Sequence, residues 1–463
     1  MEIVKKPIKS IALIWKSPKR INQQTLYRPM KYLLHTQVDE GLLLHNVVTA
    51  ETVLLNEEEK ALFEGLPTKY STSMNELIDH HFVVADEFKE DKSVIQLRAL
   101  LRKLNPSKRV TGFTILPTTE CNARCYYCFE SSHKRCTLTE EMCTDVVEYI
   151  SDKCKNEPIE ISWFGGEPLV GNKQISQICS ELKERGISYK SSMVSNAYLF
   201  DEALIQKAKN DWNLNSVQIT LDGTEEVYNR TKAYVYPKDN PFKRVLRNIE
   251  LLLDNGFAVN IRLNVTDKNY RDLEGLIELL SDRFNGRNGF SCYSHAVYEG
   301  VGFEPLEYDD FNRKVVDAKT AELDGILMEK GLLGSLAKLP YLRFIHCMAD
   351  NDSCRVIYPD GKIGMCEDKP SSDGVGDIYH DILDEEMHGR YKESKQIEGC
   401  NSCCLYPSCV NLKICPDTGK CTDLRVKWKQ KRYTDLLIKL YKKYKSDCKT
   451  DFDDGNANDV CGS

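Results

Sequence analysis

The sequence has no long apolar run, no excess of positive charge and no obvious processing site near its start. No apolar stretch approaches the roughly 18 residues of a membrane span, so we expect no contact with a membrane. The net charge of −7 argues against a general nucleic-acid-binding protein, a class that is more often basic. Lys5, Lys6 and Lys9 precede the short apolar stretch Ile11–Trp15, but no small-residue cleavage site follows. We therefore expect no signal peptide, and a location in the cytoplasm.

Cysteine, by contrast, is abundant. It accounts for 19 of the 463 residues, and most of these cysteines fall in tight clusters. In a secreted protein this number would indicate disulfides, but a reducing cytoplasm favours free thiols and metal ligands. Metal clusters explain the clustered spacing better than disulfides do. With 41% apolar residues, the chain is also long enough for about three domains, each with its own core.

The first of these groups is formed by Cys121, Cys125 and Cys128, which are separated by three and then by two residues. It directly follows the apolar run Phe113–Leu116. Four thiolates would close a zinc site or a cubane iron–sulfur site, whereas three leave one metal position open. An open iron is what a cluster needs in order to bind and cleave a substrate. The alternative is a structural zinc knuckle.

Residues 1 to about 105 are expected to form a first unit, a small sheet with helices that carries no obvious chemistry. Asn56 and Glu59 are spaced as a capping box, which predicts that a helix begins at Glu57. Apolar and β-branched runs predict strands at residues 10–15, 32–35, 42–48 and 52–55. Further helices are expected near residues 74–80 and 94–104.

From residue 111 the sequence alternates between strand-like and helix-like segments. Strands are predicted at residues 111–116, 159–164, 188–194, 216–221, 258–265 and 290–296. Helices are predicted near residues 173–185, 202–210, 242–254 and 272–284, and from about residue 140 behind a capping box of Thr137 and Glu140. Six β/α units predict an α/β fold with a parallel sheet, either doubly wound or a partial (β/α)6 TIM-like barrel. Chemistry then collects at the carboxyl ends of the strands, where the three cysteines lie.

Other distinctive residues also follow predicted strands. The second strand ends in Gly165, Gly166, Glu167 and Pro168, where adjacent glycines let a ligand approach bare backbone. A simple strand-ending turn is the alternative. On the fifth strand, the alternation of side chains would point Arg262 and Asn264 toward the same end of the sheet.

These motifs resemble those of radical SAM enzymes, whose defining sequence is Cys-x3-Cys-x-aromatic-Cys, with Tyr127 here in the aromatic position. The resemblance implies a [4Fe–4S] cluster on Cys121, Cys125 and Cys128, together with S-adenosylmethionine. Gly165–Pro168 resembles the family's GGEP motif, which meets the amino group of that cofactor. The resemblance further implies that Ser195 and Asn196 meet the ribose. Thr220 and Asp222 resemble the family's Ser-x-Asp-Gly motif, and Arg230 is the candidate for the methionine carboxylate.

The mechanism implied by this resemblance is radical chemistry. An external one-electron donor of the flavodoxin or ferredoxin type reduces the cluster. The reduced cluster cleaves S-adenosylmethionine, and the 5′-deoxyadenosyl radical takes a hydrogen atom from the substrate. The protein holds the geometry and excludes water.

The cysteines beyond residue 340 resemble those of a SPASM domain, which carries two auxiliary [4Fe–4S] clusters. The resemblance implies one cluster on Cys347, Cys354, Cys366 and Cys415, and a second on Cys400, Cys403, Cys409 and Cys421. The usual ending Cys-x2-Cys-x5-Cys-x3-Cys is altered here, because five residues separate Cys409 from Cys415. That departure puts the fourth ligand of the first auxiliary cluster in question, and Cys404 is a possible substitute for a neighbouring ligand. Two zinc ions are the alternative to iron.

The resemblance therefore predicts four regions. These are a domain at 1–105 similar to leader-peptide recognition elements, a radical SAM partial barrel at 106–310, a SPASM domain at 311–425 and a C-terminal region at 426–463. The last is expected to hold a basic helix to about Tyr444 and a disordered tail from Thr450.

SPASM enzymes mostly act on peptides or proteins, so the resemblance implies a maturase of ribosomal precursor peptides whose leader binds the N-terminal domain. The first choice is a thioether link from cysteine sulfur to carbon, as in sactipeptides and ranthipeptides. Glu367 is a candidate base, because sulfatase-maturing relatives place a carboxylate near this position. Open alternatives are carbon–carbon crosslinking, formylglycine formation as in anaerobic sulfatase maturation, and a non-enzymatic iron–sulfur electron carrier or zinc scaffold.

Overall fold

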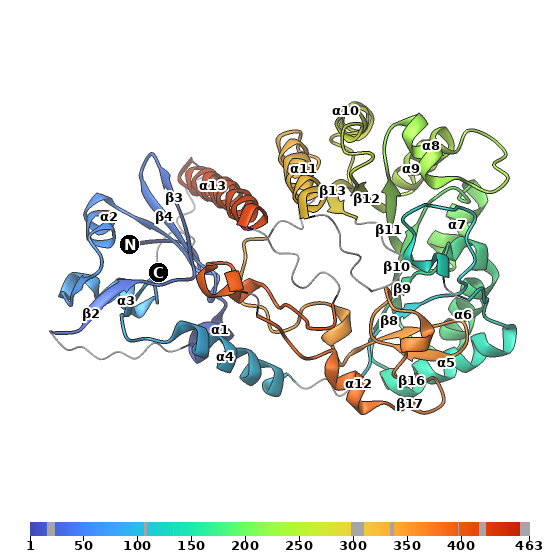
Figure 1. Cartoon of the computed structure of the whole chain (residues 1–463), viewed down its shortest axis with the longest axis horizontal. Helices are drawn as coiled ribbons and strands as arrows, with labels where there is room; N and C mark the ends of the chain where they lie inside the picture. Colours follow the sequence, from blue (N-terminus) through green and yellow to red (C-terminus); the bar gives the residue numbers. More distant parts are fainter. Residues whose placement is uncertain are drawn as a thin grey trace.

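The computed structural model describes residues 1–15, 24–105, 109–132, 134–297, 310–333, 338–396, 398–415 and 423–453. Figure 1 shows the N-terminal elements on the left and the strand–helix repeats on the right, with the cysteine-rich region between and below them. The part of the chain that holds most of the C-terminal cysteines thus lies between the N-terminal region and the strand–helix repeats.

The N-terminal region contains two small antiparallel sheets. The first has the order β1 (Glu2–Lys5), β5 (Thr52–Leu55), β4 (Gly41–Asn46) and β3 (Leu33–Val38). The second has the order β6 (Thr68–Lys69), β2 (Leu26–Pro29) and β7 (Val83–Ala85). The helices are α1 (Lys9–Ile14), α2 (Glu57–Glu64), α3 (Asn75–Asp79) and α4 (Glu90–Leu104).

Of two local predictions for the N-terminal region, the structure confirms one and contradicts the other. The capping box is confirmed, because the Asn56 side chain accepts from the Glu59 N–H at 2.9 Å and the Glu59 carboxylate accepts from the Asn56 N–H at 3.0 Å. The strand expected at residues 10–15 is wrong, since this segment forms α1. Ile11 and Trp15 are buried while Leu13 is 66% exposed, which is the spacing of a helix and not of a strand. A short apolar run does not distinguish the two.

The strand–helix repeats form a parallel sheet with strands in sequence order, which confirms the α/β fold of the partial-barrel type. The strands are β8 (Gly112–Ile115), β9 (Ile159–Trp163), β10 (Tyr189–Ser195), β11 (Leu214–Leu221), β12 (Ala258–Val265) and β13 (Phe290–Ala296). The helices are α5 (Glu140–Cys154), α6 (Asn172–Glu184), α7 (Glu202–Asn210), α8 (Glu225–Lys232), α9 (Pro241–Asp254), α10 (Leu273–Phe284) and α11 (Asp310–Glu329). Their apolar faces share one large core with the strands.

The capping residue of α5 differs from the expected one. The Thr139 hydroxyl, and not that of Thr137, accepts from the Met142 N–H at 3.1 Å. The Thr137 hydroxyl instead lies 2.6 Å from the Thr118 hydroxyl, at the loop that follows β8. The threonine nearer the helix therefore caps it, while the other ties α5 to the three-cysteine loop.

The cysteine-rich region continues the barrel sheet past its first strand. β14 (Cys354–Ile357) pairs in parallel with β8, and β15 (Lys362–Gly364), β16 (Gly376–Asp377) and β17 (Asp381–Ile382) follow in antiparallel order. A short helix, α12 (Glu385–Arg390), comes next. A Cβ on Gly112 of β8 would lie 2.9 Å from the Cys354 Sγ, so glycine leaves the space that this cysteine fills.

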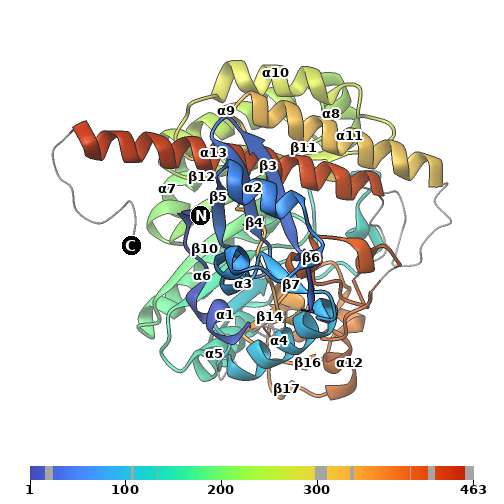
Figure 2. The ribbon, with the colours of Figure 1, turned by 90° about the vertical axis from the view of Figure 1, so that its left-hand side faces the viewer.

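The last helix, α13 (Asp423–Asp453), lies between the N-terminal sheet and the barrel in Figure 1, and Figure 2 shows it along its length. Leu437 and Tyr441 pack against Leu43 and Leu54 of the N-terminal sheet. On the barrel side α13 contacts α11, where Arg432 lies 3.4 Å from Asp324. The helix runs to residue 453, beyond the start of the tail expected to be disordered, and residues 454–463 lie outside the described part. Within the described ranges, no helix combines the length and apolar character needed to cross a membrane.

Candidate active site

A cavity of about 340 Å³ lies at the carboxyl ends of the barrel strands. Its walls come from the loop after β8 and from the ends of β9 to β12, together with Lys232 of α8. Sequence-predicted residues that line it are Cys121, Cys125, Tyr127, Cys128, Gly165, Gly166, Glu167, Ser195, Asn196, Thr220, Arg262 and Asn264. The structure therefore brings together residues spread over 140 positions of the sequence.

The three cysteines share one wall of this cavity. The loop is compact, since the Ala123 N–H donates to the Cys121 Sγ at 3.4 Å and the Cys128 N–H to the Cys125 carbonyl at 3.1 Å. Burial raises the pKa of the Cys121 thiol to about 12 and also raises the pKa of Cys125 and Cys128. All three are therefore thiols at neutral pH, and binding a metal at this wall would release their protons.

A buried ion pair of Asp222 and Lys232 supports the three-cysteine loop. The Tyr127 hydroxyl donates to the Asp222 Oδ1 at 2.6 Å, and the Lys232 Nζ lies 3.0 Å from the Asp222 Oδ2. Asp222 is fully buried and Lys232 is 4% exposed. Burial alone would lower the pKa of Lys232, but the Asp222 carboxylate and its neighbours hold it well above the usual value. The lysine therefore stays charged and fixes the aromatic residue of the cysteine motif.

Lys232 was missed by the sequence analysis, which singled out Arg230. Arg230 lies two residues earlier on α8, is largely exposed and pairs with Glu226 at 3.5 Å. Lys232 also contributes backbone to the loop, because its carbonyl accepts from the Arg124 N–H at 2.8 Å. On an amphipathic helix a displacement of two residues exchanges the outer for the inner face, and the charged spacing alone does not show which residue is inside.

The Gly-Gly-Glu-Pro turn packs against the three-cysteine loop. Gly165 has φ +115°, and a Cβ there would lie 2.3 Å from the Thr118 carbonyl. A Cβ on Gly166 would lie 2.4 Å from the Glu120 carbonyl. The glycines also line the cavity, but their first requirement is the approach of this chain's own backbone.

Glu167 is buried behind these glycines. Its Oε1 accepts from the Ser195 hydroxyl at 2.8 Å and from the Leu169 N–H at 3.1 Å. Its Oε2 accepts from the Asn196 N–H at 2.8 Å. Burial raises the pKa of Glu167 to about 7, although these hydrogen bonds act in the opposite direction. The Ser195 hydroxyl thus donates its hydrogen to Glu167. The side-chain amide of Asn196 donates to the Asn122 Oδ1 at 2.7 Å.

Polar side chains from β11 and β12 form the floor of the cavity. Thr220 and Gln218 of β11 lie beside Arg262 and Asn264 of β12, as strand alternation predicts. The Arg262 Nε donates to the Asn264 Oδ1 at 3.0 Å, and the Arg262 side chain also interacts with Tyr293. Gln218 is a further cavity residue that the sequence gave no reason to select.

Glu130 is a second carboxyl group of the cavity that the sequence analysis missed. It is 5% exposed, and its Oε1 has no hydrogen-bond partner among the described residues. Burial raises its pKa to about 8, an effect that Arg135 opposes. A buried polar atom without a partner, directed at a cavity walled by three thiols, fits a site whose remaining partner is a bound group.

The cysteines assigned to the first auxiliary cluster lie on and around the added strands. Cys354 begins β14 and Cys366 follows β15, the strand that pairs with β14 in antiparallel fashion. Cys347 lies close enough to Cys415 and Cys366 for their charges to affect one another, and burial raises the pKa of Cys347 and Cys354 to about 11. Burial also raises the pKa of Glu367, while Arg262 of the cavity lowers it.

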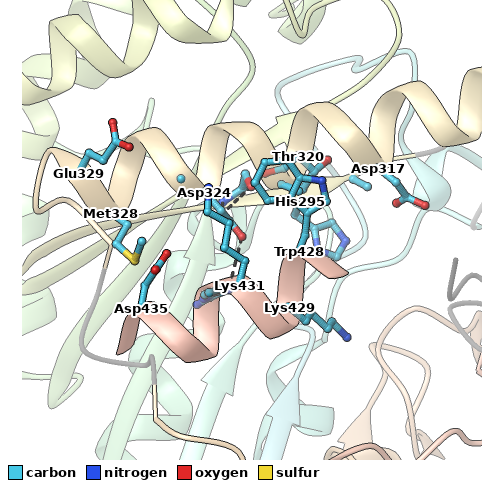
Figure 3. Close-up of a pocket in the computed structure, with 15 residues that line it drawn as sticks. His295, Asp317, Thr320, Asp324, Met328, Glu329, Trp428, Lys429, Lys431 and Asp435 are labelled. Carbon is cyan, nitrogen blue, oxygen red and sulfur yellow. Dashed lines mark hydrogen bonds and ion pairs between the residues drawn. The ribbon is translucent and has the colours of Figure 1, made fainter. Parts of the chain in front are cut away.

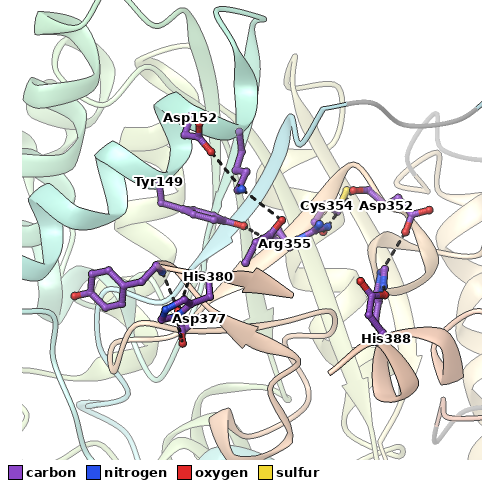
Figure 4. A network of polar contacts seen from close by, with 12 residues as sticks. Tyr149, Asp152, Asp352, Cys354, Arg355, Asp377, His380 and His388 are labelled. Carbon is purple, nitrogen blue, oxygen red and sulfur yellow. Dashed lines mark hydrogen bonds and ion pairs between the residues drawn. The ribbon is translucent and has the colours of Figure 1, made fainter. Parts of the chain in front are cut away.

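A polar network attaches the Cys354 strand to the barrel (Figure 4). The Arg355 Nε donates to the Asp381 Oδ1 at 3.1 Å, and the Tyr149 hydroxyl of α5 donates to the same oxygen at 2.7 Å. His388 of α12 lies 3.2 Å from Asp352, two residues before Cys354. The strand that begins at Cys354 is thus connected to α5 of the barrel through Asp381.

Three cysteines assigned to the second auxiliary cluster lie on short turns next to the N-terminal domain. The Asn411 side chain joins two of them, because it donates to the Cys400 Sγ at 3.6 Å and accepts from the Cys409 Sγ at 3.1 Å. Cys403 packs with the N-terminal core. Cys404, the possible substitute, accepts from the Gln430 amide of α13 at 3.1 Å. Cys421 lies outside the described residues.

The donor chemistry of these groups is that of soft thiol ligands, which suits iron–sulfur clusters and zinc alike. In the described part of the chain, no three His, Cys, Asp or Glu side chains converge closely enough to hold a single metal ion.

A second cavity of about 240 Å³ lies between the end of β13, α11 and α13 (Figure 3). Asp324 accepts from the Ser294 hydroxyl at 2.7 Å, and Trp428 and Lys429 approach from α13. No residue predicted for the site lines this second cavity.

Comparisons with known proteins match the same part of the chain. Residues 115–280 match the radical SAM superfamily. The Fe-coproporphyrin III synthase of Methanosarcina barkeri is 25% identical to this chain, in an alignment that covers 43% of this chain and 48% of that protein. The radical SAM cyclopropyl synthase TigE of Paramaledivibacter caminithermalis is 22% identical, in an alignment that covers 79% of this chain and 78% of that protein. The antilisterial bacteriocin subtilosin biosynthesis protein AlbA of Bacillus subtilis is 25% identical, in an alignment that covers 57% of this chain and 56% of that protein. The chain thus spans about half the length of the first and third of these relatives.

The fold is similar to that of the solved structure of anSMEcpe with bound AdoMet. The TM-score is 0.55 at 16% identity, and the match covers 72% of this chain and 96% of that one. The superfamily implies S-adenosylmethionine and one [4Fe–4S] cluster. Since the matched residues run from the end of β8 to α10 and include every loop that walls the cavity up to β12, the chain contains a radical SAM domain.

Proposed function

We propose that this protein is a radical SAM enzyme that modifies a ribosomal precursor peptide, using S-adenosylmethionine and three [4Fe–4S] clusters. The observation that carries the proposal is the single cavity shared by the three thiols, the Gly-Gly-Glu turn and the polar ends of four strands. Cys121, Cys125 and Cys128 would hold the cluster that faces the cavity. When bound, this cluster and S-adenosylmethionine supply an adenosyl radical that abstracts a hydrogen atom.

The chain's own residues would bind and orient the cofactor. The Glu167 Oε2 accepts one hydrogen bond in the structure, so it keeps capacity for an ammonium group. Asn196, Thr220 and Asn264 present polar atoms to the same space. Arg230 stays a prediction for the carboxylate, and the cations that line the cavity are Arg124, Arg135, Lys232 and Arg262.

The proposed auxiliary clusters lie beside this cavity and toward the N-terminal domain. Glu367 follows Cys366 and lies near Arg262, which lines the cavity, so a substrate between them would reach both. We assign Glu367 as a candidate base for the substrate. The cluster on Cys347, Cys354, Cys366 and Cys415 would then be the one nearer the substrate.

A peptide substrate is supported by the N-terminal domain and by a relative named for bacteriocin biosynthesis. β3 forms an edge of the four-stranded sheet, and its His35 and Gln37 side chains are exposed. An edge strand offers unpaired backbone groups to an extended leader peptide. Tethering the leader there would raise the concentration of the core peptide near the barrel.

The external electron donor would approach the outer side of the three-cysteine loop. Tyr126 of this loop is 43% exposed, and Tyr236 on a neighbouring loop is 92% exposed. The Val235 N–H of the neighbouring loop donates to the Asn122 carbonyl of the three-cysteine loop at 2.8 Å. Lys268 lies 4.7 Å from the Tyr126 ring centre. This mixture of aromatic and basic side chains suits a small acidic protein.

We propose cysteine thioether formation as the reaction. The C–H bond would lose its hydrogen atom to the adenosyl radical and the S–H bond its proton, and an auxiliary cluster would take up the remaining electron as the carbon–sulfur bond forms. A second candidate is carbon–carbon bond formation, which is favoured by the alignment with a cyclopropyl synthase over 79% of this chain.

The test is to incubate the reduced, reconstituted protein with S-adenosylmethionine and the small peptide encoded beside its gene. A thioether product loses the mass of two hydrogen atoms and one alkylatable thiol for each crosslink. A carbon–carbon product loses the same mass but keeps its thiols. Conversion of a cysteine to an aldehyde would instead indicate formylglycine formation, and a protein that does not cleave S-adenosylmethionine would be an electron carrier or a scaffold.

A further inference from the structure

Two arginines of α4 reach from the N-terminal domain to the cysteine-rich region. Arg98 and Arg102 are four residues apart, so they lie on one face of the helix. The Arg98 Nη2 donates to the carbonyls of Tyr406, Pro407 and Cys409 at 2.7, 3.0 and 2.8 Å. Its Nε donates to the Arg343 carbonyl at 3.0 Å. The Arg98 guanidinium therefore binds three backbone carbonyls of the turn that ends at Cys409.

Arg102 holds a different loop. Its Nε donates to the Phe344 carbonyl at 2.7 Å, and its Nη2 donates to the Asp350 Oδ2 at 2.5 Å. The Asp350 carboxylate in turn accepts from the Cys347 N–H at 3.0 Å. Arg102 thus supports the loop of Cys347, just as Arg98 supports the turn of Cys409.

Arg98 and Arg102 differ in whether a neighbouring carboxylate neutralises their charge. Arg102 forms an ion pair with Asp350, which is buried. Among the described residues, Arg98 has no carboxylate partner, and its guanidinium carbon lies 4.7 Å from the centre of the Tyr406 ring. Burial lowers the pKa of Arg98, but a guanidinium remains protonated in proteins. Within the described residues, a positive charge that no carboxylate balances therefore lies beside the cysteines of the second auxiliary set.

We propose that Arg98 is a positioning residue for an iron–sulfur cluster held by Cys400, Cys403 and Cys409, and that its charge raises the reduction potential of this cluster. The inference rests on the proposed function, which places a cluster there. A cluster bound by thiolates is negative, and reduction adds one more negative charge. A nearby cation without a counter-ion stabilises the reduced form more than the oxidised form, and it does so most strongly away from water.

The comparison with Arg102 defines the expected selectivity. Removing Arg102 alone would leave the buried Asp350 carboxylate without its partner. Removing the charges of Arg102 and Asp350 together leaves the net charge unchanged, so this double change alters the electrostatic field at either cluster much less. The Arg98 contribution should therefore appear at one reduction couple and not at the others.

The experiment is a redox titration of the full chain, reconstituted anaerobically and followed by electron paramagnetic resonance, with iron content measured in parallel. Arg98→Met removes the charge and the hydrogen bonds, Arg98→Gln keeps donors without charge, and Arg98→Lys keeps the charge. The matched control is the double variant Arg102→Met with Asp350→Asn, which removes both charges of the ion pair. Cys403→Ser identifies the couple that belongs to the second auxiliary set.

We expect Arg98→Gln to keep its iron and to shift that couple to a more negative potential, with Arg98→Lys close to the wild type. Loss of iron from this set alone in Arg98→Met would support the positioning role. Full iron with unchanged potentials in both Arg98→Met and Arg98→Gln would overturn the proposal, as would an equal shift of the same couple in the Arg102→Met, Asp350→Asn control. Should Arg98→Met not fold, Arg98→Gln and Arg98→Lys decide the result.

Failure of the proposed function would look different. If Cys403→Ser leaves the iron content and every reduction couple of the wild type unchanged, no cluster occupies this site. The second auxiliary cluster is then wrong, whatever the arginine variants do.

Discussion

The cysteines of the barrel and those of the C-terminal region are held in place in different ways. Cys121, Cys125 and Cys128 lie within eight residues, and a loop anchored by Lys232 and Asp222 fixes them inside one domain. The C-terminal cysteines are spread over more than sixty residues, and contacts from β8, α4 and α13 hold them. The first arrangement depends on local sequence, whereas the second depends on the assembly of all regions of the molecule.

The largest expected effect separates the two groups of cysteines. Cys125→Ser should remove about four iron atoms per chain and abolish cleavage of S-adenosylmethionine, because it opens the cluster that faces the cavity. Cys403→Ser should also lose iron but should still cleave S-adenosylmethionine. Iron analysis and chromatography of 5′-deoxyadenosine measure both quantities. Equal loss of cleavage in the two variants would show that the groups are not independent.

The next effect concerns the support under the barrel cysteines. Lys232→Met leaves Asp222 as a buried charge without its partner, which should lower the free energy of unfolding by about 3–5 kcal/mol. Arg230→Met, two residues away and exposed, is the control and should change it by less than about 0.5 kcal/mol. Denaturant unfolding measures both. A stable Lys232→Met protein would mean that the tyrosine and the aspartate need no cation.

A smaller effect is expected where the Gly-Gly-Glu turn meets the cysteine loop. Gly166→Ala places a Cβ 2.4 Å from the Glu120 carbonyl, so the loop must move and the affinity for S-adenosylmethionine should fall. Gly389→Ala meets nothing within 4 Å and serves as the control. Calorimetric titration with S-adenosylmethionine compares them. Unchanged affinity in Gly166→Ala would show that the loop adapts without affecting the cofactor.

The smallest effect tests the packing of the N-terminal domain. His45 is fully buried between the Thr52 hydroxyl at 2.9 Å and the Pro340 carbonyl at 2.7 Å, and burial lowers its pKa to about 4. Because the unfolded chain binds the proton more readily, stability is complete above about pH 6.5 and is lost as the pH falls toward 4. The loss by pH 5 should be about 2 kcal/mol.

His45→Gln removes this titration. Its denaturation midpoints should therefore change less between pH 7 and pH 5 than those of the wild type. An identical pH dependence in the two proteins would exclude His45 as the source.

The sequence predicted the barrel better than its surroundings, for physical reasons. Each strand from β8 to β13 has a helix after it, and the parallel sheet brings their ends together, so the cavity follows from the order of the segments. Local patterns also located α2, whose capping box is formed within four residues. The misassigned α1 shows the limit, since a short apolar run fits a strand or a helix and only the packing of Ile11 and Trp15 decides.

Residues fixed by tertiary contacts were not predictable in this way. Lys232 lies inside because α8 turns that face toward Asp222, and Arg98 is important because a turn more than 300 residues away ends against it. Neither residue belongs to a motif, and a lone charged residue on a helix gives no signal in the sequence. The sequence singled out the glycines at 165 and 166 as cofactor-binding residues, and the structure shows that they make room for backbone of the same chain.

The most direct test of the account is formation of 5′-deoxyadenosine by the anaerobically reconstituted, chemically reduced protein. The account predicts a brown protein that cleaves S-adenosylmethionine, and no cleavage in Cys125→Ser. A colourless protein that holds only zinc and forms no 5′-deoxyadenosine would contradict it.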